Sequence, residues 1–585
     1  MRKRIGEKLV TLMLVGCLVV GSLAGCGKKD DDKATSSDAK GTSQDSASGD
    51  NKEADAWELA STTPYEPYPE TVTYTTGLQV NATITYPDGS TDTSEDNAFT
   101  RLYKDKLNIQ NKTAFEAVGQ EDSEQKVNMA ITTGELPDIM RVTDYATLKE
   151  LVENDLIEDL TDSYNNCASD LMKEIYASND NKALDMATFD GKLYAIPTTS
   201  ISSGPEMLWL RGDWMDKLGL KNPETLADIE NILTQFVQQD PGGNGAGKTI
   251  GLALTMEGKG FCGSYAGAYQ SNNIFTNFGA FPKQWVAGKD GKAVYGSVQP
   301  EMKQALTVLA DWYKKGLIDP QVAVRTKNDD ITSIVTNGQC GAFFCGWWAP
   351  YLLKDSYAMN PDLEWRAFVV PAGPDGKVTM FTGNPNQNYT VVRKGFEHPE
   401  LLIKAKNVCL DYNQGTKSYT DTSDIAKEYL DYVNHAYGVD PMGGFDYYNA
   451  AALAYEHISE AIDGKRDPKD MIQYENTLYT SCKNYLDAVK NKTQPDPTDW
   501  LNYNARMVSS KLMYDTEVNE VNPVFFDQTE SMQLKWASLE KMEQEALLKI
   551  LMNEESVDYF DKFVSDWNAA GGEQITKEVN EAIGK

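Results

Sequence analysis

The sequence predicts an α/β protein that folds into at least two lobes. Short apolar strands alternate with amphipathic helices along most of the chain, and glycine or proline residues separate them. The chain has 585 residues, and 521 of them follow residue 64, where a polar N-terminal segment ends. Since one hydrophobic core seldom serves more than about 300 residues, we expect the body to contain two or more cores.

The first lobe is expected to begin with strands and helices in alternation. Residues 70–80, ETVTYTTGLQV, alternate apolar and polar side chains as a half-buried strand does. Gly134 is expected to end a helix whose Val127, Ala130 and Ile131 share one face. The alternation of elements predicts a largely parallel sheet. The other expected elements are a helix and a strand in 96–109, a strand after Pro137, a helix in 144–160 and a strand at 190–197.

The second lobe is expected to begin at residues 207–220, MLWLRGDWMDKLGL, as a strand that runs into a helix ending at Gly219. Its clearest helix lies in 299–316, with Pro300 in the first turn and Gly316 just beyond the end. A helix in 328–338, a strand at 339–346 and a C-terminal helix ended by Gly571–Gly572 complete the prediction. The expected buried stripes are Met302, Ala305, Leu306, Leu309, Trp312 and Tyr313 in one helix, and Val557, Phe560, Val564 and Trp567 in the last. Trp312 is therefore assigned to the core.

The N-terminal residues predict export. Residues 1–25 combine a basic start with an apolar run too short for a membrane span, as in a signal peptide. The run ends in Leu-Ala-Gly before Cys26, which resembles the lipobox of bacterial lipoproteins. That resemblance implies that Cys26 is lipidated and that acyl chains hold the protein at the membrane; the alternative is an ordinary secretory signal. Residues 26–64 are polar and are expected to form a disordered tether.

Charge and cysteine content exclude several classes of function. The formal charge is −32, and the first 25 residues carry four basic and one acidic side chain, so their removal leaves −35. Nucleic acid is therefore not an expected partner. With three histidines and no CxxC spacing, a zinc site is not expected. The six cysteines beyond Cys26 are expected to be buried free thiols.

Five segments occur in an order that resembles the family 1 extracellular solute-binding proteins of bacterial ABC importers, in the large LipO-like lipoprotein subgroup. They are TGELPDIM (133–140), DGKLYAIP (190–197), LWLRGDWMDKLGL (208–220), WYKKGLIDP (312–320) and the tail at 557–580. The likeness runs from about Val72 to Asn580. It implies the class II fold of periplasmic binding proteins, with two α/β lobes, hinge crossings, an extra helical C-terminal part and a ligand cleft.

The resemblance also implies where the lobes divide. The N-terminal lobe is expected to comprise 65–195 with 385–430, and the C-terminal lobe 196–384 with 431–585. The chain is expected to cross between the lobes near 195–200, 383–389 and 420–440.

The residues QCGAFFCGWWAP (339–350) contain the leading candidates for ligand binding. In the family, the matching strand brings its end to the cleft. An indole face there suits the C–H patches of a sugar ring. Because neighbours on a strand point to opposite sides, one of Trp347 and Trp348 is expected to face ligand and the other the core.

Other candidates lie at expected strand ends or crossings. Trp285 is either a lid residue or a scattered surface tryptophan, and the amides near residue 386 serve either hydroxyl recognition or the hinge. The candidates are Trp209, Arg211, Trp285, Asn386, Gln387, Tyr389, Asp144, Tyr145, Tyr447 and Tyr448, with Asn449 beside them.

Residues 240–252, DPGGNGAGKTIGL, resemble the EF-hand-like calcium loop of many relatives. Asp240 and Asn244 are kept, but Gly242 and Lys248 stand where oxygen ligands are needed. We expect a turn without calcium, and no metal or cofactor. The GNGAGKT that overlaps it lacks the spacing of a phosphate-binding loop.

These observations predict a lipid-anchored, monomeric binding protein that captures a carbohydrate, most simply an oligosaccharide, and delivers it to the permease of an ABC importer. The alternatives are a receptor for peptides or other polar solutes, and a surface binding domain without a transport role. An enzyme such as a glycosidase is disfavoured, because no segment resembles a hydrolase.

Overall fold

The computed structural model describes residues 47–585 except 81–85, 88, 203, 266, 370–376 and 436–437. Glu53–Lys585 form one compact unit. The expected signal peptide, Cys26 and the first part of the expected tether lie outside the described residues. The expectation of a disordered tether to residue 64 is wrong for Ala47–Thr62, which form helix α1. Ala60 in this helix is fully buried, and Trp57 packs against the first hydrophobic core.

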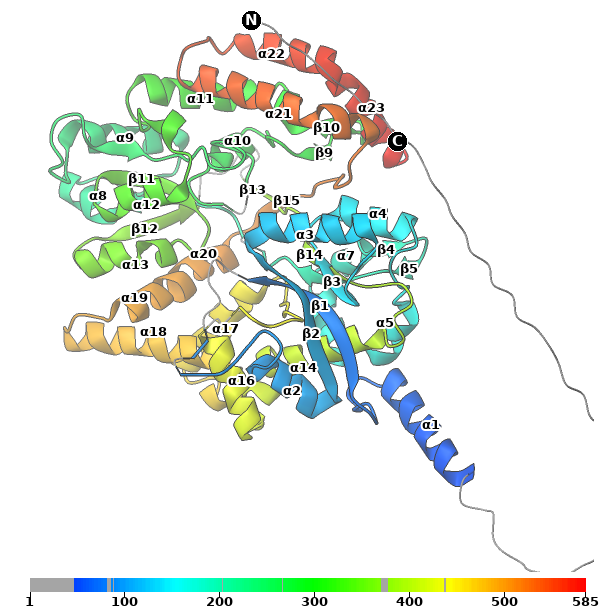
Figure 1. Cartoon of the computed structure of the whole chain (residues 1–585). Helices are drawn as coiled ribbons and strands as arrows, with labels where there is room; N and C mark the ends of the chain where they lie inside the picture. The colour runs from blue at the N-terminus through cyan, green and yellow to red at the C-terminus, as the bar shows by residue number, and fades with distance from the viewer. Residues whose placement is uncertain are drawn as a thin grey trace, which may run out of the picture. The chain divides into compact units, whose positions relative to one another are not determined.

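The first lobe contains a five-stranded mixed sheet in the order β2-β1-β3-β14-β6 (Figure 1). β1 (Val72–Val80) runs parallel to β2 (Ile109–Val118) and β3 (Ile139–Val142). β14 (Asn386–Val392) returns from the second lobe and runs antiparallel to β3 and to β6 (Ile196–Thr199), so the sheet is less parallel than expected.

Helices pack around this sheet and begin and end where the sequence indicates. Asn97 caps α2 in a reciprocal capping box with Thr100, and Gly134 ends α3 in the left-handed conformation at φ 73°. The helices are α2 (Ala98–Leu107), α3 (Gly119–Thr133), α4 (Tyr145–Glu153), α5 (Thr161–Cys167), α6 (Asp170–Ala177), α7 (Lys182–Asp185), α14 (Glu400–Asn413), α15 (Lys417–Thr420) and α16 (Asp424–Asn434), with the small hairpin β4 (Thr188–Phe189) and β5 (Lys192–Leu193).

The second lobe is built on a four-stranded sheet in the order β12-β7-β11-β8. β7 runs antiparallel to β11 and β12, whereas β8 is parallel to β11. The strands are β7 (Met207–Arg211), β8 (Ile250–Leu252), β11 (Cys340–Cys345) and β12 (Trp365–Val369), beside the separate hairpin β9 (Trp285–Ala287) and β10 (Ala293–Tyr295). The helices are α8 (Gly212–Leu218), α9 (Leu226–Gln239), α10 (Asn272–Thr276), α11 (Met302–Lys314), α12 (Asn328–Thr336) and α13 (Pro350–Met359).

The C-terminal helices complete the core of this lobe. Figure 1 shows α21 and α22 beside α11. The expected stripe of α11 is buried except for Tyr313, which is partly exposed, so the assignment of Trp312 to the core is confirmed. The expectation that Gly571–Gly572 end the last helix is wrong. Gly571 kinks the chain at φ 134°, and the helix resumes beyond it. These helices are α21 (Glu530–Leu551), α22 (Tyr559–Trp567) and α23 (Glu573–Ala582).

The chain passes between the two sheets at 200–206 and again at 382–385. The first hydrophobic core includes Ile196, one residue beyond the expected boundary at 195. It also includes Phe445, which lies beyond the expected boundary at 430 and the expected crossing at 420–440. The division into lobes at those residues stays a prediction. A helical layer follows, composed of α17 (Ala450–Ile462), α18 (Gln473–Asn491), α19 (Pro497–Tyr503), the π-helix η4 (Asn504–Ser509) and α20 (Ser510–Asp515). Strands β13 (Val378–Phe381) and β15 (Val518–Val521) pair in parallel as a separate two-stranded sheet.

All six cysteines in the described part of the chain are free and buried, which confirms that expectation. They are Cys167, Cys262, Cys340, Cys345, Cys409 and Cys482. No helix among the described residues is long and apolar enough to span a membrane.

Candidate functional site

The tryptophan pair lies at the carboxyl end of β11, in the turn that leads into α13. The strand ends at Cys345, so the two indoles do not alternate across a sheet as expected; both are half-buried. Gly346 allows this turn, because a Cβ there would lie 2.9 Å from the Trp348 Nε1. Both rings therefore remain partly accessible at the edge of the second sheet.

The guanidinium of Arg506 stacks on the indole ring of Trp347. Its guanidinium carbon lies 4.3 Å from the centre of the indole ring, and its Nη2 donates a hydrogen bond of 2.6 Å to the Tyr474 hydroxyl. The side chain is 5 % exposed, and its Nε has no hydrogen-bond partner. Arg506 belongs to η4, and such wide helical turns often occur at functional sites because they redirect a side chain.

Two exposed phenols complete what we call the Trp347 cluster, defined as Trp347, Tyr351, Tyr474 and Arg506. Tyr474 is 47 % exposed and Tyr351 44 %. Burial of the hydroxyl end raises the pKa of Tyr474, Arg506 opposes that shift, and the neighbouring Tyr351 adds to it. The cluster thus offers a flat apolar face, a free N–H donor and two hydroxyls, which suits a ring-shaped ligand with a polar edge.

The segment that leaves the first lobe approaches this cluster at Asp446. Burial and the nearby Glu475 raise the pKa of Asp446 to about 6, and Arg506 opposes the shift. Glu475 in turn accepts a hydrogen bond of 2.9 Å from His457 Nδ1 when that nitrogen is protonated. The Thr199 hydroxyl donates to the Asp446 carbonyl at 2.5 Å, which fixes the segment against β6.

Tyr447 and Tyr448 follow Asp446 and face the first lobe. The Tyr447 hydroxyl donates to Glu174 at 3.0 Å. Tyr448 lines a cavity of about 280 Å³ at the crossing 382–385. The cavity is lined by three segments: the first lobe, the crossing and the residues beyond β15. Its other lining residues are Asn179, Lys182, Asp185, Met186, Thr382, Gly383, Pro385, Asn522, Pro523 and Phe526. Tyr448 thus lies at an opening beside the crossing, and Asn449 is exposed.

Three candidates from the second lobe lie away from the cluster. Trp209 is central in β7, 2 % exposed, and its ring stacks on Phe343. Arg211 is buried and pairs with Asp213 at 2.6 Å. Because β7 is antiparallel to β11, Arg211 lies about 13 Å from the end that Met207 shares with Cys345. The structure does not bring Arg211 and Trp347 together.

Trp285 is neither a lid residue nor a scattered surface residue. It begins β9, is 7 % exposed, and packs against Tyr295, Phe525 and Trp536. The expectation of a polar loop is wrong, because partners from the C-terminal helices cover the ring.

The candidates of the first lobe are dispersed around the ends of its strands. Asn386 is buried and donates to the Ala183 carbonyl at 3.0 Å, whereas Gln387 is exposed. Tyr389 lies in the first core, where burial raises its pKa to about 12. Asp144 caps α4 by accepting from the Thr147 N–H at 2.8 Å, and Tyr145 stacks on Phe189. Their roles toward a ligand stay predictions.

With this geometry in view, comparison with known proteins decides the family. Residues 103–393 match the family described as bacterial extracellular solute-binding protein. The chain belongs to this family.

Named relatives of this solute-binding protein include two sugar-binding proteins. The polygalacturonan/rhamnogalacturonan-binding protein YtcQ of Bacillus subtilis is 24 % identical over 79 % of this chain and 83 % of its own length. The fructooligosaccharide ABC transporter substrate-binding protein FusA of Streptococcus pneumoniae is 28 % identical over 50 % of this chain and 52 % of its own. Lipoprotein LipO of Bacillus subtilis is 32 % identical over 25 % of this chain and 27 % of its own.

Solved structures show the same two-lobe fold. FusA in complex with kestose has a TM-score of 0.55 at 17 % identity, covering 88 % of this chain and 98 % of that one. An HMO-binding, ABC-transporter-associated solute-binding protein from Bifidobacterium longum infantis has a TM-score of 0.57 at 16 % identity with the same coverage.

The calcium-like loop of this solute-binding protein keeps its turn through hydrogen bonds of its own. Asp240 accepts from the N–H groups of Asn244 and Gly245, each at 2.9 Å, and from the Thr249 hydroxyl at 2.5 Å. These donors hold the carboxylate oxygens that would otherwise face a cation. Within the described ranges, no group of three or more His, Cys, Asp or Glu residues could hold a metal ion.

Sequence reasoning missed Tyr351, Tyr474 and Arg506. Tyr351 and Tyr474 stand in the first turns of helices, where a tyrosine has no special signature. Arg506 carried a weak signal, because it is the one charged residue in LNYNARMVSS (501–510). The π-helix that turns it toward Trp347 has no pattern that sequence periodicity detects.

Proposed function

We propose that this solute-binding protein captures a carbohydrate, most simply an oligosaccharide, between its lobes and delivers it to the permease of an ABC importer. The observation that carries the proposal is the Trp347 cluster at the edge of the second sheet. The sugar-binding activities named for YtcQ and FusA support it.

The chemistry of the cluster favours a sugar. The Trp347 face offers dispersion contacts to the C–H groups of a pyranose or furanose ring, and the guanidinium of Arg506, which stacks on the indole, helps to hold it in position. Ring hydroxyls can accept from Arg506 Nε and exchange hydrogen bonds with the Tyr351 and Tyr474 phenols. Closure of the lobes around such a ligand removes these groups from water, which strengthens each contact.

The proposal also covers the location of the protein at the cell surface. A signal peptide at 1–25, lipidation at Cys26 and a short tether before α1 would hold a monomeric body at the outer face of the cell membrane, within reach of its permease. The family is extracellular, and the relative LipO is named a lipoprotein. The family and its relatives are binding proteins, so we expect the sugar to be released unchanged.

The test is a binding screen with the protein beginning at Glu53. Thermal unfolding is followed with mono- and oligosaccharides and short peptides, and hits are measured by calorimetry. A ligand at one hundred times its Kd should stabilise the protein by about 2.7 kcal/mol. Trp347→Ala should weaken the sugar at least tenfold, because it removes the stacking face.

Tyr419→Ala is the matched control, since Tyr419 is an exposed aromatic residue on α15. It should leave binding unchanged. A response to peptides with none to sugars would overturn the proposal, as would hydrolysis of the sugar or a Trp347→Ala protein that binds like the wild type.

A further inference from the structure

Arg141 is a charged residue within the short, largely buried strand β3. Within the described part of the chain its guanidinium has no hydrogen bond or ion pair, although the side chain is only partly exposed. Burial lowers its pKa, and only Asp440 opposes that shift. Such a group is costly to keep unless something pairs with it.

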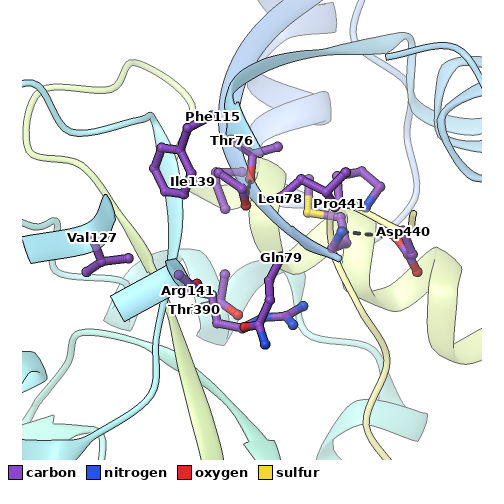
Figure 2. Close-up of a pocket in the computed structure, with 13 residues that line it drawn as sticks. Thr76, Leu78, Gln79, Phe115, Val127, Ile139, Arg141, Thr390, Asp440 and Pro441 are labelled. Atoms are coloured by element: carbon purple, nitrogen blue, oxygen red, sulfur yellow. Dashed lines mark hydrogen bonds between the residues drawn. The ribbon is translucent and has the colours of Figure 1, made fainter. Parts of the chain in front are cut away.

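Two further polar side chains converge on Arg141. Thr390 of β14 lies opposite Arg141 in the strand register, and its hydroxyl is buried without a hydrogen bond. Gln79 is the second-last residue of β1, and Figure 2 shows its amide beside the guanidinium of Arg141 and Thr390. The three line a cavity of about 20 Å³, which is room for about one water molecule. Arg141 also lines an adjoining cavity of about 60 Å³ toward α4.

The charges around this cavity favour an anion. Asp440 is the carboxylate that faces Arg141, but its Oδ1 already accepts from the Tyr103 hydroxyl at 2.9 Å and the Met442 N–H at 3.0 Å. Lys406 is buried nearby and donates to the Met442 carbonyl at 2.9 Å. Burial and the charge of Arg141 lower the pKa of Lys406 to about 8. Arg141 and Lys406 thus share one nearby carboxylate, that of Asp440, and its Oδ1 is already occupied.

The acids of the adjoining cavity are also committed. Glu124 accepts from the Thr143 hydroxyl at 3.0 Å. Asp144 accepts from the N–H and hydroxyl of Thr147 at the start of α4. Neither is paired with Arg141, so the guanidinium remains available for a ligand.

We propose that Gln79, Arg141 and Thr390 form a subsite for a carboxylate of the ligand, so that this protein recognises an acidic oligosaccharide, one that contains uronic acid units. The inference rests on the proposed function and deepens it. All three side chains can donate: the guanidinium in a two-point fork, the hydroxyl and the amide once each. A carboxylate accepts from all of them, whereas a sugar hydroxyl leaves the positive charge unbalanced.

The location is suited to ligand binding. The carboxyl ends of the parallel strands β1 and β3 meet here, which is where open α/β sheets bind ligands. The guanidinium also lies against Gly443, where a Cβ would be 2.6 Å from Nη2. Gly443 is three residues from Asp446, so their Cα atoms are at most about 11 Å apart. Asp446 in turn interacts with Arg506, so the segment 443–446 connects the subsite to the Trp347 cluster, and we expect one oligosaccharide to contact both.

The experiment compares one sugar with and without its charge. Calorimetry on the protein beginning at Glu53 measures a galacturonate trisaccharide and its methyl ester, which has the same linkage and no carboxylate. Short peptides with a free C-terminal carboxylate and inorganic phosphate are the other probes. We expect the acid to bind at least tenfold more tightly than the ester, and no binding of peptide or phosphate alone.

Variants assign the preference to the subsite. Arg141→Met should abolish discrimination between acid and ester while leaving ester binding intact, and Thr390→Val should reduce discrimination severalfold. Arg366→Met is the control, since Arg366 pairs with Asp216 and Glu364 elsewhere on the surface and should preserve discrimination.

The outcomes separate the two proposals. If acid and ester bind equally, or if Arg141→Met keeps the preference, the carboxylate subsite is refuted while the sugar receptor stands. Should only peptides bind, the proposed function fails as well. Should Arg141→Met not fold, Thr390→Val and the wild-type comparison still decide the question.

Discussion

Asp446 is one side chain that we expect to make the stability of this protein depend on pH. Burial raises its pKa from 3.8 to about 6. Below about pH 4 the group is protonated in both folded and unfolded chains, so it contributes nothing there. Between pH 4 and 6 the unfolded chain loses the proton first, so stability falls as pH rises and stays lower above pH 6. The loss is about 3 kcal/mol.

Asp446→Asn should remove this effect, because an amide keeps the acceptor for the Tyr447 N–H without the buried charge. Urea unfolding should show the variant more stable than the wild type at pH 7.5 by about 3 kcal/mol and equal to it near pH 4. Asp487→Asn on the exposed side of α18 is the control and should change neither value. An equal difference at both pH values would show that packing, not charge, separates the variants.

Single residues also show where prediction from sequence succeeds and fails. The place of Trp347 just after a strand could be predicted from the apolar run before it, whereas its role toward a ligand stays a prediction. Trp209 and Trp285 share the residue type but are covered by Phe343 and by the C-terminal helices, contacts between residues far apart in sequence. Arg141 gave a signal that was not used: it is a charged residue in an otherwise apolar strand.

At the scale of elements, α1 is the clearest departure from expectation, and its role can be measured. Lys404 is fully buried in α14 and donates through Nζ to the carbonyls of Ala60 and Glu66. Removal of residues 1–64 would take away the Ala60 acceptor and the Trp57 ring that stacks on His398. We expect a loss of about 3 kcal/mol, since a buried ammonium loses a hydrogen bond.

The measurement is denaturant unfolding of proteins that begin at Glu53 and at Tyr65. The protein beginning at Glu53 is the control and should match the full body. Trp57→Ala should lose part of the same stability with the chain length unchanged. If both shortened proteins unfold alike, α1 is an accessory of the tether and not part of the first core.

The loop at 240–252 carries a second prediction at this scale. Because three donors of the protein already occupy the Asp240 carboxylate, millimolar calcium or a chelator should leave the midpoint of thermal unfolding unchanged. Asp240→Ala should destabilise the protein by about 2 kcal/mol with or without calcium, since it leaves the Thr249 hydroxyl and two N–H groups without their acceptor. A rise in the midpoint with calcium would show that the ion displaces these donors.

Most elements of the fold could be predicted because their signals are local. The pattern of 70–80 became β1, and Gly134 and Gly219 end helices in the left-handed conformation as expected. The direction of β14 within the first sheet could not be predicted, because its partners β3 and β6 lie far away in the sequence. The kink at Gly571 depends on contacts with α21, so a glycine pair was misread as a helix end.

At the scale of the whole molecule, charge and ligand preference oppose each other. The chain carries a formal charge of −32, yet the proposed subsite takes an anion. A negatively charged protein can bind an anion only if the charges close to the subsite, and not the net charge of the chain, determine the binding free energy. The field of the whole protein acts over a Debye length of about 10 Å at 0.1 M salt, whereas the partly buried guanidinium is screened much less. Global repulsion should therefore slow the approach of an acidic sugar without preventing its binding.

The repulsion between the negatively charged protein and an acidic sugar should make the association rate depend on salt. Stopped-flow measurements of tryptophan fluorescence should show that the association rate constant of the galacturonate trisaccharide rises severalfold when ionic strength increases from about 20 to 200 mM, because salt screens the repulsion. The methyl ester is the matched control, and its rate should stay constant since it carries no charge. Arg141→Met should keep the salt dependence of association but lose the slow dissociation of the acid. An association rate that falls with salt would mean that the acid meets a positive surface that the subsite alone does not provide, and the ligand path would then have to begin at other cations than Arg141.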